Sequence, residues 1–320
     1  MKQVLLGKTG MHVSALCLGC LPFGTTIEEE IAYQLADHYF EAGGRFFDTA
    51  NNYSFWVDGA TGDESETVLG RWMKDRKNRD QIILATKVGA RPTFPGGGFE
   101  NREGLSAQTI EKAVEDSLAR LGTDSIDLYY AHIDDRQTPL EETLAAFDRL
   151  VKAGKVRTIG CSNIATWRIE QARNISRING WTQYCCVQQR YTYLRPKLGA
   201  DFGIQVAIND ELLDYGKAHD DFSLLAYSPL LAGAYTRKEV TLPKEYRSSD
   251  AEVRMSTLAI VAREVGATLN QVVLAWMMQA TPAILPLIAA STEKQLDENL
   301  EALNVHLAQE HIVFLNAAAS

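Results

Sequence analysis

Eight short apolar runs recur along the chain, and the stretch between each pair is long enough for a helix. The runs are residues 15–19, 45–48, 82–87, 126–132, 156–160, 184–188, 223–227 and 283–288. Strands that are apolar on both faces are typical of parallel sheets covered by helices. Eight strand–helix units that close on themselves form a barrel, so this alternation predicts an α/β fold of the (β/α)8 TIM barrel type.

The segments between the runs have the apolar spacing of amphipathic helices. Two of them begin at Ser106 and Pro139, and their apolar faces comprise Ile110, Val114, Leu118 and Leu121 in the first and Leu140, Leu144, Phe147 and Leu150 in the second. Residues 3–6 and 12–15 flank a glycine-containing turn, which predicts an N-terminal β-hairpin, and a C-terminal helical extension follows the last run. We therefore expect a single barrel domain over residues 1–320.

An open, doubly wound sheet is the main alternative to a barrel. If such a sheet bound a dinucleotide, its first strand would normally be followed by a GxGxxG turn. No glycines with that spacing follow the first apolar run. The sequence therefore favours the barrel.

Composition and charge limit the class of partner. The chain has 32 Lys and Arg against 41 Asp and Glu, a formal charge of −9, and no long basic run, which argues against nucleic-acid or anionic-membrane surfaces. No apolar stretch approaches the ~20 residues of a membrane span. The five cysteines, an odd number, fit a reducing cytoplasmic compartment, and the lone CxxC at Cys17 and Cys20 gives no metal site. We expect a small-molecule partner; monomer and homo-oligomer both stay open.

Four polar residues stand at or just after the ends of apolar runs: Asp48, Tyr53, Lys87 and His132. The catalytic groups of a (β/α)8 barrel lie at the carboxyl ends of its strands, so these side chains are expected to meet. An unpaired lysine is costly to bury, and Asp48 is the obvious counter-ion for Lys87. A plain Asp–Lys ion pair that braces two strands is the structural alternative.

The functional interpretation adds Tyr53, which follows Asp48 closely enough to fold back over the barrel mouth. Lowering a phenol pKa from about 10 by about three units requires roughly 4 kcal/mol, and a cation at about 4 Å in an effective dielectric near 20 supplies that order. We therefore expect Lys87 to lower the pKa of Tyr53, making it a general acid for a carbonyl oxygen, with His132 orienting that oxygen or sharing in proton transfer. None of these groups supplies hydride, which implies a nicotinamide cofactor.

At this point the sequence resembles the aldo-keto reductase superfamily, in the manner of its bacterial members, over nearly the whole chain. The matching motifs are Leu18-Gly19 before Phe23-Gly24, residues 48–53 (DTANNY), 62–66 (GDESE), 85–87 (ATK), the strand ending in His132, 154–163 (GKVRTIGCSN), 227–230 (YSPL) and 295–299 (QLDEN). Their common order and spacing make the resemblance specific.

The resemblance implies roles for individual residues. It makes Tyr53 the general acid, tuned by Lys87 and Asp48, with His132 positioning the carbonyl. It assigns the cofactor to Ser162, Asn163 and Gln188 at the nicotinamide carboxamide, Tyr227 against the ring, Ser228, Leu230 and Gly233 at the pyrophosphate, and Ser291, Gln295, Glu298 and Asn299 around the adenosine end. Alone, Ser162 would be interpreted as a helix cap, Gln188 as an ordinary strand-end residue and Tyr227 as a core residue.

Cofactor choice is where the chain departs from the family pattern. Many NADPH-specific members have an arginine at the position of Gln295, and a charge-assisted contact to phosphate is worth about 1.5–3 kcal/mol. Lys294, Ser291 and Thr292 are partial substitutes. NADP(H) is the expected cofactor on family grounds, with NAD(H) or dual use left open.

The substrate region is the second departure. Residues 54–61 form a longer segment after Tyr53 than many members have, and the Gly- and Pro-rich residues 91–104 are interpreted as a substrate-covering loop. Trp56 and Phe94 are the predicted substrate contacts, with Tyr191 and Tyr193 as further candidates. The predicted function is NAD(P)(H)-dependent interconversion of an aldehyde, ketone or sugar-like carbonyl with its alcohol.

Two other functions stay as alternatives. One is a cofactor-binding, redox-sensing barrel with little turnover. The other is a barrel hydrolase that uses Asp48 and a second carboxylate, such as Asp134 or Asp135. The hydrolase would be active without nicotinamide.

Overall fold

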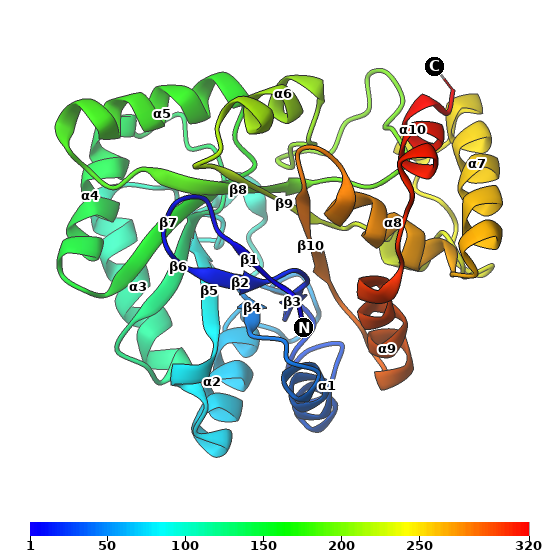
Figure 1. The fold of residues 1–320 in the computed structure, drawn as a ribbon. Helices are drawn as coiled ribbons and strands as arrows, with labels where there is room; N and C mark the ends of the chain where they lie inside the picture. The colour runs from blue at the N-terminus through cyan, green and yellow to red at the C-terminus, as the bar shows by residue number, and fades with distance from the viewer. Residues whose placement is uncertain (320) are drawn as a thin grey trace.

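The computed structural model of the protein describes residues 1–319, and its centre is a closed parallel barrel (Figure 1). The strands follow one another in the order β10-β3-β4-β5-β6-β7-β8-β9. Their bounds are β3 Cys17–Gly19, β4 Phe46–Asp48, β5 Ile83–Val88, β6 Ile126–Ala131, β7 Val156–Ser162, β8 Tyr184–Arg190, β9 Ser223–Tyr227 and β10 Ile284–Ile288. All eight predicted strands are present, with ends displaced by at most two residues.

Helices surround the barrel in Figure 1. Within residues 1–319 they are α1 Glu29–Glu41, α2 Glu64–Arg76, α3 Ala107–Leu121, α4 Leu140–Lys152, α5 Thr166–Asn179, α6 Asp210–Ala218, α7 Ser249–Val265, α8 Leu269–Gln279, α9 Glu293–Glu301 and α10 Gln309–Ala317. As predicted, Ser106 caps α3, accepting a hydrogen bond from the Thr109 amide at 3.2 Å, and Pro139 precedes α4. The last helix, α10, packs on α7 and forms the predicted C-terminal extension.

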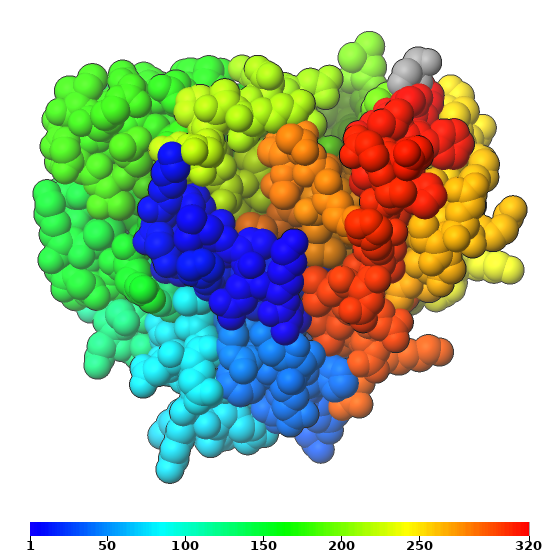
Figure 2. Space-filling view, in the orientation of Figure 1, coloured from blue at the N-terminus to red at the C-terminus, as the bar shows by residue number. Residues whose placement is uncertain are grey.

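The predicted hairpin closes one end of the barrel. Strands β1 (Gln3–Leu5) and β2 (His12–Ser14) pair antiparallel, and Figures 1 and 2 show the hairpin, in dark blue, lying across the barrel. Leu6, Met11 and Val13 pack into one apolar cluster with inward residues such as Phe46 of β4. The hairpin thus seals the amino ends of the strands, and the opposite end forms the mouth at which the predicted site residues lie.

The remaining apolar core lies between the strands and the helices, and it includes buried residues of every barrel strand. All five cysteines are buried and unbonded, as expected for small core residues, and the cytoplasmic location inferred from them stays a prediction. In residues 1–319 no single helix is long and apolar enough to span a membrane. Helices α7 and α8 reach the required length and composition only together, with a bend of 92° at the break between them.

Candidate active site

The register of two neighbouring strands brings Asp48 and Lys87 together. Asp48 ends β4 and pairs with Ala85 of β5, and Lys87 is two residues further along β5. Residues two apart on a strand point to the same side, so both side chains enter the barrel mouth. Both are fully buried and form an ion pair.

Lys87 is fully engaged. Its Nζ donates to Asp48 Oδ1, to the Thr49 carbonyl at 2.7 Å and to Tyr53 Oη at 2.5 Å. An ammonium group has three N–H donors, so each has an acceptor. Tyr53 is 8% exposed, and its hydroxyl donates to Asp48 Oδ1 at 3.1 Å. The predicted Asp–Tyr–Lys cluster is therefore formed, and its phenol is the one member that reaches the surface of the mouth.

Burial sets the protonation states of the cluster. It raises the pKa of Tyr53 well above the ordinary value of 10.0, and the Asp48 carboxylate raises it further. The lowered pKa expected from the sequence is wrong for this state, because the cation is shared with a carboxylate that also faces the phenol and because phenolate loses more hydration than phenol. Burial likewise lowers the pKa of Lys87, although Asp48 opposes that shift. Tyr53 is thus a neutral phenol at physiological pH.

His132 lies beside this cluster. It follows β6 directly, and its ring centroid is 6.0 Å from that of Tyr53, with the rings nearly perpendicular. Burial lowers the pKa of His132 well below 6.5, and the Lys87 charge adds to the effect. The imidazole is therefore neutral and carries one N–H donor. Its buried Nδ1 has no hydrogen-bond partner within the described chain.

Gln188 joins the cluster from the other side of the barrel. It lies in β8, is buried, and donates from Nε2 to Asp48 Oδ2 at 2.8 Å. Ser162, at the end of β7, donates to the Gln188 carbonyl at 2.7 Å. The residue that precedes α5 is Ala165, so Ser162 does not cap that helix. The side chains of Gln188 and Ser162 are therefore both fixed by hydrogen bonds to other residues of the barrel mouth.

Asn163 and Tyr227 form a second polar pair at the mouth. Asn163 has the left-handed φ of 57°, and its Nδ2 donates to the His132 carbonyl at 3.0 Å. Its Oδ1 accepts from Tyr227 Oη at 2.7 Å. Tyr227 ends β9 and is half-buried, and it packs against the edge of the apolar cluster inside the barrel. One face of the mouth therefore has amide and aromatic groups fixed beside the histidine.

The segment after β9 has an unusual backbone. Ser228, Leu231 and Ala232 adopt φ values of 55°, 48° and 57°, and Gly233 has 92°. Side chains other than glycine rarely adopt this region, and such strain collects at functional sites. In this segment, which holds the predicted pyrophosphate residues and includes the half-buried Leu230, the Leu231 and Gly233 amides donate to the Ser228 and Leu230 carbonyls at 3.3 and 2.8 Å. The segment is thus a strained turn at the end of β9.

The predicted adenosine residues lie on and before α9. Gln295 Oε1 accepts from the Ser291 amide and hydroxyl, both at 2.9 Å. Glu298 accepts from Thr268 Oγ1 at 2.7 Å, and Asn299 donates to the Ala289 carbonyl at 3.2 Å. These residues are brought together, but their polar groups are bonded to their own neighbours.

Asn270 of α8 links this region to the segment that follows β9. Asn270 Nδ2 donates to Thr236 Oγ1 at 3.0 Å and to Glu298 at 3.4 Å. Thr236 follows Gly233 closely. Asn270 thus connects the segment after Gly233 to Glu298 of α9.

A profile of the Aldo/keto reductase family matches residues 15–319. The chain belongs to this family. The resemblance inferred from the motifs and the predicted barrel are both confirmed, and the protein is an oxidoreductase of the aldo-keto reductase family.

Named relatives of this aldo-keto reductase come from bacteria and fungi. It is 31% identical to the uncharacterized oxidoreductase YrpG of Bacillus subtilis, covering 99% of this chain and 95% of that protein. It is 32% identical to the norsolorinic acid reductase stcV of Emericella nidulans, covering 97% and 79%. Aryl-alcohol dehydrogenase [NADP(+)] of Phanerodontia chrysosporium is 30% identical, covering 96% and 83%. The solved structure of the aldo-keto reductase Tm1743 with epalrestat has a TM-score of 0.77, 26% identity and 99% coverage of both chains.

The aromatic residues of this aldo-keto reductase differ partly from expectation. Trp56 is 53% exposed and meets Phe55 at 5.1 Å, and Phe55 meets Phe99 of the 91–104 loop, also at 5.1 Å. Phe94, at 52% exposure, is in none of these contacts, and Phe99 is the ring that the sequence did not single out. Phe94 and Phe99 are five residues apart in the same irregular loop, so the sequence could not indicate which of them packs against Phe55.

Two further candidates, Tyr191 and Tyr193, both contact Trp276 of α8. Tyr193 is buried, packs edge-on against Trp276 of α8 and donates to the Leu315 carbonyl at 3.1 Å. Tyr191 stacks on the same Trp276 at 5.7 Å. Both tyrosines therefore pack against the helices that follow β9.

Proposed function

We propose that this protein is an NAD(P)(H)-dependent enzyme that reduces an aldehyde or ketone to an alcohol, or runs the reverse reaction, with Tyr53 as the proton donor. The observation that carries the proposal is the cluster in which Lys87 donates to Tyr53 Oη at 2.5 Å while Asp48 binds both groups. A neutral phenol with a cation against its oxygen is suited to give a proton to a developing alkoxide.

The residues beside Asp48, Tyr53, Lys87 and His132, which we call the tetrad, fit a nicotinamide cofactor. Asn163 and Gln188 carry amide groups beside the cluster, and Tyr227 carries a ring that would lie against the nicotinamide. The strained turn from Ser228 to Gly233 would contact the pyrophosphate. Residues of α9 would hold the adenosine end. A bound reduced nicotinamide would supply the hydride that none of the protein groups provides.

Proton transfer follows from the hydrogen bonds of Tyr53. Its hydroxyl donates to Asp48 Oδ1. A carbonyl oxygen at the mouth would take that hydrogen bond in place of Asp48, and the proton would pass to it as negative charge develops. The phenolate left behind is stabilised by Lys87, which keeps its bonds to Asp48 and Thr49. The neutral His132 would donate its N–H to the same oxygen and orient it.

NADP(H) is the proposed cofactor, with NAD(H) or dual use as the alternative. The name of one relative, aryl-alcohol dehydrogenase [NADP(+)], supports NADP(H). Against it stands Gln295, whose Oε1 is occupied by Ser291 and which carries no charge for a 2′-phosphate. Lys294 is exposed beside it and is the available cation.

The proposed substrate contacts are Trp56 and Phe94, and we add Phe99 because it packs against Phe55 beside Trp56. They belong to the segments that follow Tyr53 and Lys87. The name of one relative, aryl-alcohol dehydrogenase, supports a substrate with aromatic character.

Paired fluorescence titrations with NADP⁺ and NAD⁺ test the cofactor half of this proposal. We expect quenching of tryptophan emission by at least one of them, and the ratio of the two Kd values reports the preference. Turnover of benzaldehyde with the bound reduced cofactor tests the other half. Binding without turnover of a broad carbonyl panel would favour the redox-sensing alternative, whereas a folded sample that binds neither nucleotide would refute the proposal.

A further inference from the structure

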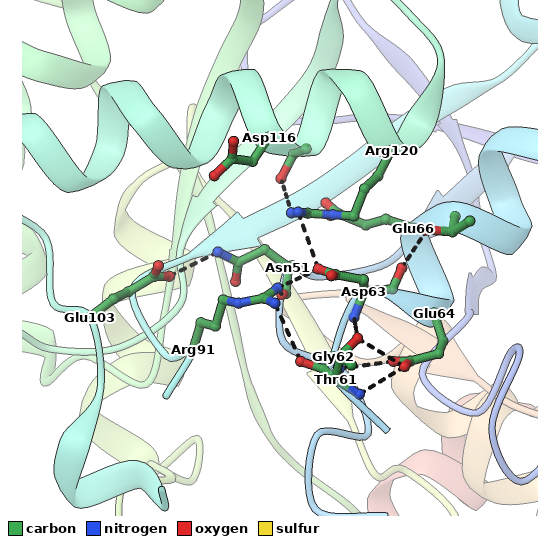
Figure 3. A network of polar contacts seen from close by, with 12 residues as sticks. Asn51, Thr61, Gly62, Asp63, Glu64, Glu66, Arg91, Glu103, Asp116 and Arg120 are labelled. Atoms are coloured by element: carbon green, nitrogen blue, oxygen red, sulfur yellow. Dashed lines mark hydrogen bonds and ion pairs between the residues drawn. The ribbon is translucent and has the colours of Figure 1, made fainter. Parts of the chain in front are cut away.

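One carboxylate outside the tetrad bridges the two segments that carry its tyrosine and its lysine. Glu103 Oε1 accepts from Asn51 Nδ2 and from the Gly89 amide, both at 2.8 Å (Figure 3 shows the Asn51 contact). Asn51 is two residues before Tyr53, and Gly89 is two residues after Lys87. The same oxygen therefore joins the backbone leading to the proton donor and the backbone leaving its cation.

Asn51 is also held by its own main chain. Its amide donates to the Lys87 carbonyl at 3.3 Å, and its carbonyl accepts from Arg91 Nη1 at 2.6 Å. The side-chain Nδ2 and both backbone polar groups of Asn51 are thus hydrogen-bonded to β5 or to the loop that follows it, while the buried Oδ1 has no partner within the described residues. Any displacement of Asn51 would be passed to Tyr53 through two peptide units.

Both ends of the 91–104 loop are hydrogen-bonded to Asn51. Arg91 begins the loop and Glu103 closes it, and the Glu103 amide donates to the Arg91 carbonyl at 2.8 Å. The Gly104 amide donates to the Gly89 carbonyl at 3.2 Å. The base of the loop is therefore a fixed structure, although its composition predicted no regular element, while its tip carries the exposed Phe94.

A second set of ion pairs supports Arg91 from the helices. Arg91 binds Asp63 Oδ1 at 2.6 Å, Arg120 of α3 binds the same carboxylate at 3.1 Å, and Arg120 Nε donates to Glu66 at 2.7 Å (Figure 3). Glu66 is fully buried and accepts from Thr86, the residue before Lys87, at 2.5 Å. We call the contacts of Glu103 and Arg91 with Asn51 the clamp. Through Arg120 and Glu66 the clamp is connected to β5 at a second point, Thr86.

We infer that Glu103 is a positioning residue for the Tyr53–Lys87 pair: by accepting from Asn51 and Gly89 it holds the phenol at the distance from the ammonium that proton transfer requires. The inference rests on the proposed function for its effect on rate, but the clamp itself is testable without turnover. Small misplacements of reacting groups are expensive in rate, which gives a remote contact of this kind a measurable effect.

Two substitutions separate the clamp from the charge. Glu103→Ala removes both acceptor contacts, and we expect kcat for benzaldehyde reduction to fall about 10- to 100-fold with KM changed less than about twofold. Glu103→Gln keeps an oxygen that accepts both N–H groups but removes the charge, and it should retain kcat within about threefold. Glu100→Ala, an exposed residue of the same loop, is the matched control and should match the wild type.

Coupling to Asn51 gives a further test. Asn51→Ala removes the donor of the shared hydrogen bond, so the double variant with Glu103→Ala should lose less than the product of the two single losses. A loss in Glu103→Gln as large as that in Glu103→Ala would show that charge rather than position matters and would overturn the inference. An unchanged kcat in a folded Glu103→Ala would overturn it as well.

Amide hydrogen exchange tests the clamp independently of activity. In Glu103→Ala we expect faster exchange in residues 49–53 and 87–90 than in the wild type, and wild-type exchange in Glu103→Gln. Unaltered exchange in all variants would refute the clamp. A wild type that binds nicotinamide but turns over no carbonyl would refute the proposed function while the exchange result still decides the clamp. If Glu103→Ala fails to fold, Asn51→Ala replaces it in both measurements.

Discussion

The two sides of the barrel mouth are built differently. On the β4–β5 side, Asp48 and Lys87 are fully buried, and every donor of the lysine is used within the cluster. On the α9 side, Ser291 is exposed, Gln295 and Glu298 are half-exposed, and each is bonded to a near neighbour. The first side is preorganised before any ligand binds, whereas the second must exchange local hydrogen bonds for ligand contacts.

This difference separates chemistry from cofactor choice. Buried charges are costly to leave unpaired, so substitutions on the β4–β5 side are expected to affect both rate and folding. Exposed polar groups exchange partners with water at little cost, so substitutions on the α9 side are expected to alter affinity for one nucleotide over another and little else. The predictions below test that separation, beginning with the largest effect.

Tyr53→Phe should have the largest effect on rate. It removes the only proton that the cluster presents to the mouth, and we expect kcat to fall by about 10²- to 10⁴-fold. Nucleotide Kd values, measured by fluorescence titration, should change less than about twofold because the phenol lies apart from the α9 side. A variant that keeps wild-type kcat would show that another group donates the proton.

Lys87→Met should have the largest effect on stability. It leaves the Asp48 carboxylate buried without its counter-ion, and we expect the free energy of unfolding to fall by about 3–5 kcal/mol. The exposed Lys112–Asp116 pair on α3 is the matched control, and Lys112→Met should cost about 0.5 kcal/mol or less. Urea denaturation of both variants provides the comparison; equal losses would contradict the contrast between buried and exposed pairs.

Gln295→Arg should change nucleotide preference without changing chemistry. It places a guanidinium at the position where the family resemblance leads us to expect a contact to the 2′-phosphate, and we expect the NADP⁺ Kd to fall about 10-fold or more relative to that of NAD⁺. Gln309→Arg on α10 adds the same charge at another exposed position and should leave the ratio unchanged. An unaltered ratio in Gln295→Arg would show that Lys294 or another cation already satisfies the phosphate.

The smallest effect concerns pH. Burial and Asp48 raise the pKa of Tyr53 above 10.0, so the phenol that donates the proton is fully formed throughout the neutral range. The kcat for reduction should therefore change less than about twofold between pH 7 and 9 and fall only as the pH passes the raised value. Oxidation of the alcohol needs phenolate and should instead accelerate as the pH rises. A reduction rate that falls between pH 7 and 9 would indicate a lowered Tyr53 pKa.

The barrel fold and the proximity of Asp48, Tyr53 and Lys87 could both be predicted from the sequence. Continuous apolar strands and intervening amphipathic helices have few other ways to bury their surfaces, and strand ends determine which polar residues meet. That is why Asp48, Tyr53 and Lys87 could be placed together from the spacing of Phe47, Thr86 and their neighbours.

Three features could not be predicted from the sequence, because each depends on contacts that only the folded structure defines: the direction of the Tyr53 pKa shift, the ring that meets Phe55, and the contacts of Glu103. Whether Lys87 lowers the Tyr53 pKa depends on how strongly Asp48 and burial oppose it, and only the distances decide that balance. The choice between Phe94 and Phe99 as the ring that meets Phe55 depends on the loop backbone. Glu103 was absent from the predicted site because its role arises from hydrogen bonds to two residues that are 52 and 14 positions away in the chain.

The most direct measurement of the central claim is the transfer of a labelled hydride. The protein is incubated with benzaldehyde and with NADPH, and separately NADH, in which both hydrogens of the hydride-donating carbon are replaced by deuterium, and the alcohol is analysed by mass spectrometry. The account predicts one deuterium on the carbinol carbon of each alcohol formed, with product formation largely lost in Tyr53→Phe. Alcohol without deuterium, or no alcohol from a folded sample with nucleotide bound, would contradict it.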